Sequence, residues 1–225
     1  MSRTFSRVLA AVLGAAILVG GVGTVAFGVG RYGNDISWPQ CGGAFPTKAG
    51  FGIVGVNNGV PFSQNPCLSA EWQWALANKG APAYYMNISN PGTTSPSSYG
   101  ASAAAYALNY ATTATGASSA ANHVWWIDVE TANSWSSDQA ANAAVVQGAL
   151  TYLKQHTAKA VGIYSTGYQW GVITGGVHLG APVWAAGASS AASAPSMCGT
   201  GFTGQPVKVV QYPAGAYDGD YRCGR

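Results

Sequence analysis

Charged residues are scarce in this chain of 225 residues. Only 8% of its positions are Asp, Glu, Lys or Arg, and the acids number seven, five Asp and two Glu. There is no basic stripe and no run of like charge to neutralise phosphates, so the composition argues against nucleic acid as a partner. With so few acids, any cluster of them is informative about function.

The cysteines and histidines also lack the spacing of metal ligands. No two of the four cysteines stand at CxxC spacing, and the three histidines show no ligand spacing among themselves. An even number of cysteines in an oxidising compartment predicts two disulfides instead. Three pairings are open in principle, and nearest-neighbour pairing favours Cys41 with Cys67 and Cys198 with Cys223. No metal and no cofactor is therefore expected.

A long uncharged run occurs at the amino terminus. Arg3 and Arg7 precede residues 8–30, which carry no charge, and this is the layout of a secretory signal. Thr24-Val25-Ala26 offers the small residues of a cleavage site, but the run is also long enough to remain as an anchor. Residues 1–30 are thus predicted to be a signal peptide or an N-terminal membrane anchor. The protein is expected to be secreted or extracytoplasmic, with membrane contact only through an uncleaved segment.

The remaining residues, 31–225, suit one domain with its own core. Without Arg3 and Arg7, eight basic residues stand against seven acids, so the net charge of the mature chain is near +1. Eight Trp and twelve Tyr in an uncharged background favour a neutral ligand such as a sugar, although most aromatic rings in any domain belong to the core. We expect a monomer.

Short apolar runs alternate with helix-like stretches, as in βα units around a parallel sheet. The expected helices are 69–78, 97–110 and 138–156, the last with Ser136 as its cap. The linkers between the last three expected strands show no convincing amphipathic helix. The pattern predicts the α/β class: a single TIM-barrel-like domain, an irregular barrel of about five βα units followed by three strands without intervening helices. The expected strands are 32–37, 51–57, 83–88, 124–130, 160–164, 182–186, 207–211 and 217–222.

The fourth of these strands ends on Asp128-Val129-Glu130. Side chains two apart on a strand point to the same side, so both carboxyls are expected to face one space, at the strand end where α/β barrels bind ligands. Two acids in a partly dry pocket drive their pKa values apart, which supplies the proton donor and the anion that glycosidic bond cleavage needs. The alternative is a surface strand end with two solvated acids.

Polar residues end several other predicted strands, and their repetition suggests one shared rim. For each one taken singly, a turn or capping role is an equal alternative. The residues expected to bind substrate at this rim are Asp35, Asn57, Asn87, Gln211, Tyr212, Asp218 and Asp220.

Together these segments resemble the family 25 glycoside hydrolases, the lysozymes that cleave bacterial peptidoglycan between N-acetylmuramic acid and N-acetylglucosamine, and a wider set of related exported domains. The resemblance spans nearly the whole mature chain, and the Asp-x-Glu strand is its most specific mark. The matching segments are Asp35-Ile36-Ser37, Trp126-Ile127-Asp128-Val129-Glu130, Ile163-Tyr164-Ser165, Pro182-Val183-Trp184-Ala185, Gln211-Tyr212 and Asp218-Gly219-Asp220.

The resemblance implies an incomplete barrel of five βα units and three further strands. It also implies that Glu130 is the general acid and that Asp128 orients or stabilises the 2-acetamido group of the substrate. Asp35 and one of Asp218 or Asp220 would line the subsite, and Trp184 would contact the substrate.

The sequence departs from the lysozymes in four places. Ala186-Gly187 replaces polar or aromatic rim residues, the connection at 39–50 is too short for a normal helix, and neither the cysteines nor Trp38-Pro39-Gln40-Cys41 is typical. Two functions therefore remain open: an exported hydrolase of peptidoglycan or a related N-acetylated polysaccharide, or a carbohydrate-binding or wall-associated barrel without turnover. A purely structural surface domain is a third. Sequence leaves the retaining or inverting outcome open, because it does not determine the carboxyl separation.

Overall fold

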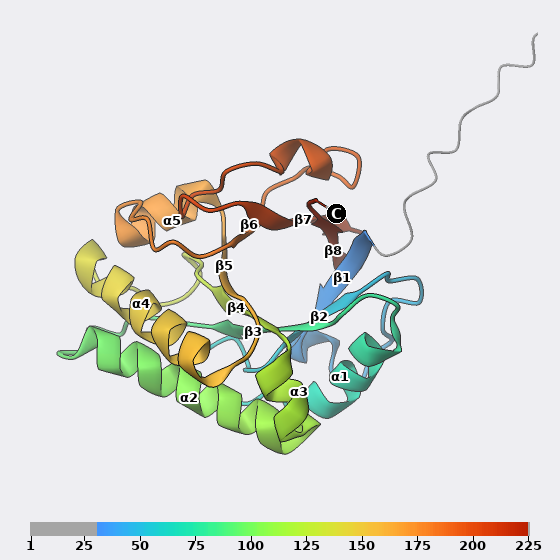
Figure 1. The fold of residues 1–225 in the computed structure, drawn as a ribbon, viewed down its shortest axis with the longest axis horizontal. Coiled ribbons are helices and arrows are strands. Elements are labelled where there is room, and N and C mark those ends of the chain that lie inside the picture. The colour runs from blue at the N-terminus through green and yellow to red at the C-terminus, as the bar shows by residue number, and fades with distance from the viewer. Residues whose placement is uncertain (1–30, 225) are drawn as a thin grey trace, which may run out of the picture.

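The computed structural model describes residues 31–224, which form a closed barrel of eight strands (Figure 1). The predicted signal or anchor at 1–30 lies outside the described residues. No helix in the described part is long and apolar enough to span a membrane. The strands are β1 (Tyr32–Ile36), β2 (Gly52–Gly55), β3 (Ala83–Asn87), β4 (Val124–Asp128), β5 (Val161–Ser165), β6 (Val183–Ala186), β7 (Val207–Ala214) and β8 (Tyr217–Arg222).

Strands β1 to β7 run parallel to one another, and β8 closes the barrel by pairing antiparallel with both β7 and β1. A hairpin turn joins β7 directly to β8, so β8 starts at the end of the barrel where the parallel strands finish. Its register pairs Asp218 with Asp35. Two acids 183 positions apart in the sequence thereby become neighbours.

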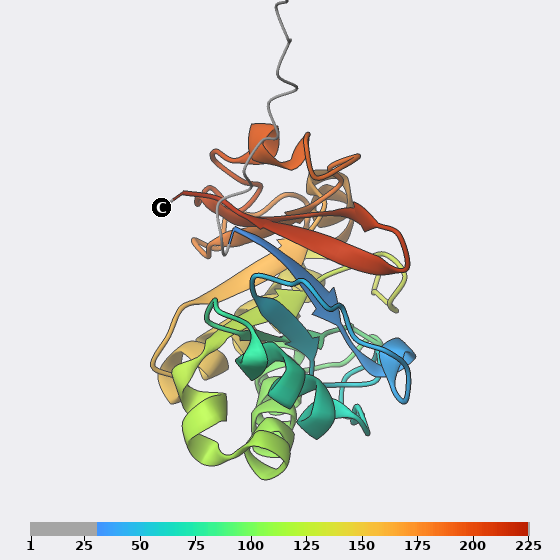
Figure 2. The same ribbon diagram turned by 90° about the vertical axis from the view of Figure 1, so that its right-hand side faces the viewer.

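The helices cover one side of the barrel. Figure 1 shows the α-helices beside the strands β2 to β5, and Figure 2 shows β7 and β8 crossing the opposite side with no helix in front of them. This agrees with the predicted five βα units followed by bare strands, and the first connection holds only the short 3-10 helix η1 (Trp38–Gln40). The other helices are α1 (Leu68–Ala77), α2 (Pro96–Thr115), α3 (Ala117–Asn122), α4 (Gln139–His156), α5 (Gly167–Thr174) and the 3-10 helix η2 (Ala194–Met197).

Three local expectations need correction. The cap of α4 is Asp138, whose carboxylate accepts a hydrogen bond from the Ala141 N–H at 3.0 Å, whereas the Ser136 hydroxyl accepts from the Asp138 N–H outside the helix. The pairing of β4 with β5 ends at Asp128, so the strand is two residues shorter than predicted. Helix α2 continues five residues beyond its predicted end, because its alanine-rich second half still packs an apolar stripe into the core.

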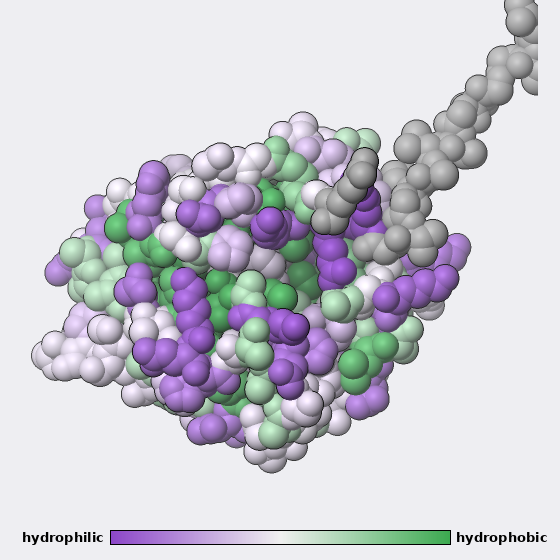
Figure 3. Space-filling view, in the orientation of Figure 1, coloured by the Kyte–Doolittle hydropathy of each residue, from purple (hydrophilic) through white to green (hydrophobic). Residues whose placement is uncertain are grey.

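Successive side chains on each strand point alternately out of the barrel and into it, so the core has an outer and an inner part. Outward side chains pack against the helices, and inward ones fill the barrel with large rings. Trp184 is 1% exposed and lies 4.5 Å from Tyr164 and 5.9 Å from Trp126, measured between ring centroids. Figure 3, which views the barrel from the end where its strands begin, shows apolar side chains gathered over the middle of this face inside a polar border. The barrel interior is therefore a packed floor, and a ligand must bind above it.

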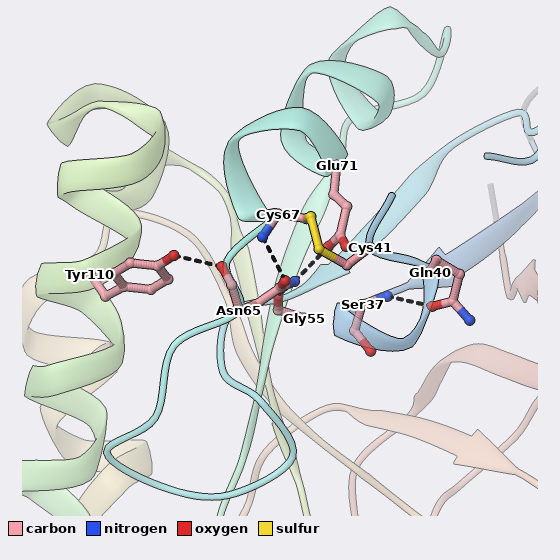
Figure 4. The surroundings of a disulfide bond; sticks show 8 residues. All are labelled: Ser37, Gln40, Cys41, Gly55, Asn65, Cys67, Glu71 and Tyr110. Carbon is pink, nitrogen blue, oxygen red and sulfur yellow. Dashed lines mark hydrogen bonds between the residues drawn. A yellow bond between two sulfur atoms is a disulfide. The ribbon is translucent and has the colours of Figure 1, made fainter. Parts of the chain in front are cut away.

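Two disulfides secure the connections, with the pairing that the sequence favoured. Cys41–Cys67 joins the chain after η1 to the start of α1, as Figure 4 shows, and its Cα atoms lie 5.4 Å apart. Cys198–Cys223 joins the end of η2 to the chain after β8, with Cα atoms 5.6 Å apart. Each disulfide ties an irregular connection to a neighbouring element where no long helix does so.

A buried carboxyl lies beside the first disulfide. Glu71 is 0% exposed, and its Oε2 accepts a 2.6 Å hydrogen bond from the Asn65 amide, which also donates to the Gly55 carbonyl (Figure 4). Its other oxygen has no partner among the described residues. Burial raises the pKa of Glu71 to about 7.

Removal of this carboxyl is expected to flatten the pH dependence of stability. The folded chain holds the Glu71 proton more tightly than the unfolded chain, so the free energy of unfolding falls as pH rises from about 4.5 to about 7. In Glu71→Gln we expect the melting temperature to drop less between pH 5 and pH 8 than in the wild type. Asp138→Asn, which keeps an efficient cap, is the control. An unchanged pH dependence in Glu71→Gln would contradict the assignment.

Helices α2 and α4 meet through a reciprocal pair of glycines. A Cβ added at Gly100 would lie 1.9 Å from the Val145 carbonyl oxygen, and one at Gly148 would lie 2.0 Å from the Ser97 carbonyl oxygen. Both obstructing atoms belong to backbone, which cannot rotate away. The two helices therefore approach backbone to backbone, and only glycine is tolerated at either position.

We expect Gly100→Ala to lower the free energy of unfolding by about 1–3 kcal/mol, the usual cost of overpacking. This opposes the gain of up to about 1 kcal/mol that Gly→Ala brings in an exposed helix. Gly171→Ala in α5, where a Cβ meets nothing within 4 Å, is the matched control and should be neutral or stabilising. Denaturant unfolding measures both, and equal behaviour of the two variants would disprove the close approach.

Candidate active site

A pocket of about 110 Å³ opens at the carboxyl end of the barrel, above the ring of Trp184. Every strand except β2 contributes to it, directly or by the residue that follows. Because the strands converge at this end, residues far apart in the sequence share one small space. The lining residues are Asp35, Tyr85, Asp128, Glu130, Tyr164, Trp184, Gln211 and Asp218.

Asp128 and Glu130 form the centre of the pocket. Asp128 is only 4% exposed and accepts a short hydrogen bond from the Asn87 side-chain amide, while Glu130 is half-buried. The two carboxyls lie within hydrogen-bonding reach of each other. Burial raises the pKa of both, and the charge of Glu130 raises the pKa of Asp128 further, well above its ordinary range. The pair therefore holds a proton more tightly than two solvated carboxyls would.

A second carboxyl pair lies across the pocket. Asp220 is fully buried beneath it, accepts a 2.9 Å hydrogen bond from the Trp184 indole N–H, and faces Asp35 within hydrogen-bonding reach. Burial raises the pKa of Asp35 to about 7 and that of Asp220 well above its usual value. Two adjacent buried carboxyls cannot both ionise cheaply, so this pair also shares a proton.

Gln211 connects the two sides of the pocket. Its side-chain oxygen accepts from the Tyr164 hydroxyl at 2.7 Å, and its side-chain nitrogen donates to Asp35 at 3.0 Å. The amide is thereby held in one orientation. Asp218 stands at the exposed edge, next to Asp35 in the sheet register, and burial raises its pKa as well.

The pocket is acidic and uncompensated. Five of the seven acids of the chain lie in or directly under it, and no Lys, Arg or His is among its lining residues. Within the described residues, no group of three or more His, Cys, Asp or Glu is arranged to hold a metal ion. What the arrangement can do is hold and transfer protons in a partly dry space that accepts a neutral, hydroxyl-rich ligand.

The structure brings together most, but not all, of the residues predicted to form the site. Asn87 lies behind Asp128 and orients it instead of lining the pocket. Asn57 is turned away, because its side chain pairs with both backbone groups of Asn87 at 2.8 and 3.0 Å. Tyr212 faces outward and packs under η2, since it alternates on β7 with the inward Gln211. The remaining predicted residues line the pocket or, for Asp220, lie beneath it.

Sequence reasoning missed two lining residues, Tyr85 and Tyr164. Tyr85 stands two positions before Asn87 and Tyr164 is register-paired with both Asp128 and Trp184, so strand alternation was the available signal. Each reads as an ordinary core aromatic in the sequence alone. Both rings separate the acids from the barrel interior.

Solved structures show the same fold in known lysozymes. A family GH25 lysozyme from Aspergillus fumigatus superposes with a TM-score of 0.63 at 15% identity, covering 87% of this chain and 94% of that one. A muramidase from Trichobolus zukalii gives a TM-score of 0.61 at 18% identity over 87% and 94% of the two chains. A bacterial lysozyme from Streptomyces coelicolor gives 0.58 at 15% identity over 86% and 92%. At these identities the likeness establishes the fold. No curated protein matches the chain.

The sequence itself matches a protein family over residues 75–195. The matched region runs from α1 to η2, and it includes the β4 strand with its two acids and the β6 strand with Trp184. It covers more than half of the chain. The chain therefore belongs to the family described as Lysozyme-like protein 1.

Proposed function

We propose that this protein is a glycoside hydrolase that cleaves peptidoglycan or a related N-acetylated cell-wall polysaccharide. The observation that carries the proposal is the pair of carboxyls, Asp128 and Glu130, that share one pocket at the carboxyl end of a lysozyme-like barrel. The membership in a lysozyme-like family and the fold shared with muramidases and lysozymes support the same substrate class.

In this proposal Glu130 is the general acid. It is the more exposed member of the pair, so it can reach the glycosidic oxygen of a bound chain while Asp128 stays below it. The pair carries one proton, and that proton protonates the leaving oxygen from Glu130 as the bond breaks. Asp128 is then the anion, held in place by the Asn87 amide.

The closeness of the two carboxyls supports a substrate-assisted route. Inverting enzymes separate their carboxyls by about 6.5–9.5 Å to hold a water between them. Asp128 and Glu130 are within hydrogen-bonding reach and leave no such room. We propose that the 2-acetamido oxygen of the substrate attacks the anomeric carbon, with Asp128 stabilising the N–H of that group, and that the anomeric configuration is retained. Water then opens the cyclic intermediate, with Glu130 as the base.

The other pocket residues bind the sugar. Trp184 offers an apolar floor, and Gln211, Asp35 and Asp218 present acceptors and donors to its hydroxyls. Asp220 acts beneath the floor by holding the indole and sharing a proton with Asp35. The sequence left open whether Asp218 or Asp220 lines the subsite, and we propose that Asp218 contacts the substrate.

We also propose that the domain acts outside the cytoplasm as a monomer, without metal or cofactor. Its two disulfides are consistent with an oxidising compartment. Arg31 lies at the amino end of the barrel, opposite the pocket.

Replacement of the acid is the direct test. We expect Glu130→Gln to reduce peptidoglycan hydrolysis by at least about a hundredfold, the usual size of a general acid's contribution. The measurement is the release of reducing ends from purified cell walls. Asp138→Asn removes a negative charge outside the pocket and should retain wild-type turnover.

Two outcomes would count against the proposal. Unchanged turnover in Glu130→Gln would exclude Glu130 as the acid. Glycan binding without product, in the wild type as well as the variant and across a broad panel of acetylated polysaccharides, would instead favour the non-catalytic carbohydrate-binding barrel.

A second test concerns the pH dependence of turnover. The negative charge of Asp218 raises the pKa of Glu130, so its removal should lower that pKa. Glu130 must be protonated to act, and Asp218→Asn should therefore move the alkaline limb of the kcat profile to lower pH. A shift to higher pH, or none at all, would contradict the placement of Asp218 beside the acid.

A further inference from the structure

Positive and negative charge occupy opposite ends of the barrel. All seven acids lie toward the end where the parallel strands finish: five in or under the pocket, Glu71 in the first turn of α1, and Asp138 at the cap of α4. Seven of the ten basic residues fall in the described part of the chain, and all seven lie toward the other end. Each stands shortly before a parallel strand, near its start, or near the end of a helix or of β8.

We call this end of the barrel the amino-end face. Its five lysines have exposed side chains, whereas its two arginines are partly buried. They are Lys48, Lys79, Lys154, Lys159 and Lys208, with Arg31 and Arg222. These residues are scattered along the sequence, so no run of positive charge is visible there. The fold gathers them, because strand starts and helix ends meet at one end of a βα barrel.

An apolar pocket of about 320 Å³ lies in the middle of the amino-end face. Lys208 and Arg222 are its charged lining residues, and the others are apolar or glycine, with Phe51 and Trp126 among the largest. The guanidinium of Arg222 lies 3.8 Å from the centre of the Phe51 ring and donates to the Ala81 carbonyl, which fixes it to the wall of the pocket. Figure 3 looks onto this face, where the polar border surrounds the apolar middle.

We propose that the amino-end face docks on an anionic lipid bilayer, with its lysines against the headgroup phosphates and its apolar pocket against the boundary of the acyl chains. Charge complementarity supports this partner, because anionic leaflets attract clustered lysines and no acid of the chain stands on this face to neutralise them. Cations around an apolar centre are also the chemistry by which proteins lie on a membrane surface.

Two other partners fit the face less well. A soluble polyanion would satisfy the lysines but offers nothing apolar to the pocket. A second copy of the chain would have to present its acidic end, yet five of its seven acids lie in or under a small pocket and Glu71 is fully buried. The described chain also begins on this face, at Arg31, so residues 1–30 join the barrel from the side that we assign to the membrane.

Docking by this face would set the orientation of the domain. The acidic pocket opens at the opposite end of the barrel and stays accessible. Anionic lipid repels that acidic end, so the division of charge selects one orientation. The inference stands on the charge and the shape of the amino-end face, and it does not require the proposed hydrolase activity.

The test is co-sedimentation of the full chain with vesicles. We expect tighter binding to vesicles of equal parts phosphatidylcholine and phosphatidylglycerol than to vesicles of phosphatidylcholine alone, and weaker binding as salt is added. Lys79→Gln combined with Lys208→Gln should lower the affinity for the anionic vesicles by about thirtyfold, about fivefold for each lysine near the surface. Both side chains are exposed, so the melting temperature should stay close to that of the wild type.

The matched control loses the same net charge at the other end of the barrel. Asn58→Asp combined with Ser98→Asp places two acids at exposed positions, one after β2 and one in the first turn of α2. This protein should bind the anionic vesicles much more tightly than the lysine variant does. All the proteins keep residues 1–30, so a difference between them reports on the face alone.

A second measurement covers the case in which residues 1–30 carry every protein onto both kinds of vesicle. Lysine amines of the membrane-bound wild type are acylated with a water-soluble reagent and identified by mass spectrometry. We expect Lys79 and Lys208 to be protected on the anionic vesicles and reactive on the neutral ones. In this case, equal reactivity on both vesicles would overturn the proposal.

Three other results would also overturn it. The first is wild-type affinity in the lysine variant together with a clear preference of both proteins for anionic vesicles. The second is binding to soluble polyphosphate as tight as binding to the anionic vesicles, which would show a general polyanion site. The third is sedimentation without vesicles that the lysine variant abolishes, which would show stacking of copies. Failure to hydrolyse cell walls would defeat the proposed function and leave the vesicle result unaffected.

Discussion

Burial of carboxyl groups in a pocket that no basic side chain lines is the constraint on which this structure depends. Five acids gather where the strands of the barrel end, and each is harder to ionise there than in water. Proton sharing between Asp128 and Glu130 and between Asp35 and Asp220 allows them to coexist. Neutral donors complete the arrangement, namely the indole of Trp184 and the side-chain amides of Asn87 and Gln211. A neighbouring arginine or lysine would lower the pKa of these carboxyls and so favour the loss of their protons.

The barrel makes this arrangement stable by giving each polar donor a rigid support. Tyr164 holds Gln211 by a hydrogen bond, and the packed rings beneath the pocket hold Trp184. On the helical side, α2 and α4 lock together through their glycine contact. On the bare side, where β6 to β8 have no α-helix, η2 and the Cys198–Cys223 disulfide take that role. Rigidity matters because a displacement of about 1 Å between catalytic groups can cost about a hundredfold in rate.

Departures from the family pattern fall mostly in the connections. The short link after β1 has room only for η1, and the Cys41–Cys67 disulfide secures it against α1. Glu71, the one buried acid far from the pocket, packs beside that disulfide with an amide partner. These features change how the barrel is held together, and they leave the carboxyl end open.

Much of the fold was predictable, because period-two and period-3.6 patterns report which faces are buried. The strand with Asp128 and Glu130 was clear for this reason, and so was the helix at 138–156. The cap of that helix was misassigned, since Ser136 and Asp138 offer similar oxygens and only the backbone path selects one. Asn57 and Tyr212 were placed in the site because sequence shows that a polar group ends a strand, but not which way it turns.

The sequence by itself indicated the order of the strands, favoured the two disulfide pairs that the structure has, and singled out the acids that gather in the pocket. These follow from local patterns and from the scarcity of charge. Only the tertiary structure decided which groups touch. Closure of the barrel by an antiparallel β8 set Asp218 beside Asp35 and buried Asp220, which accepts a hydrogen bond from the Trp184 indole. Such contacts join residues tens to nearly two hundred positions apart, so they depend on register and packing, which no local pattern encodes.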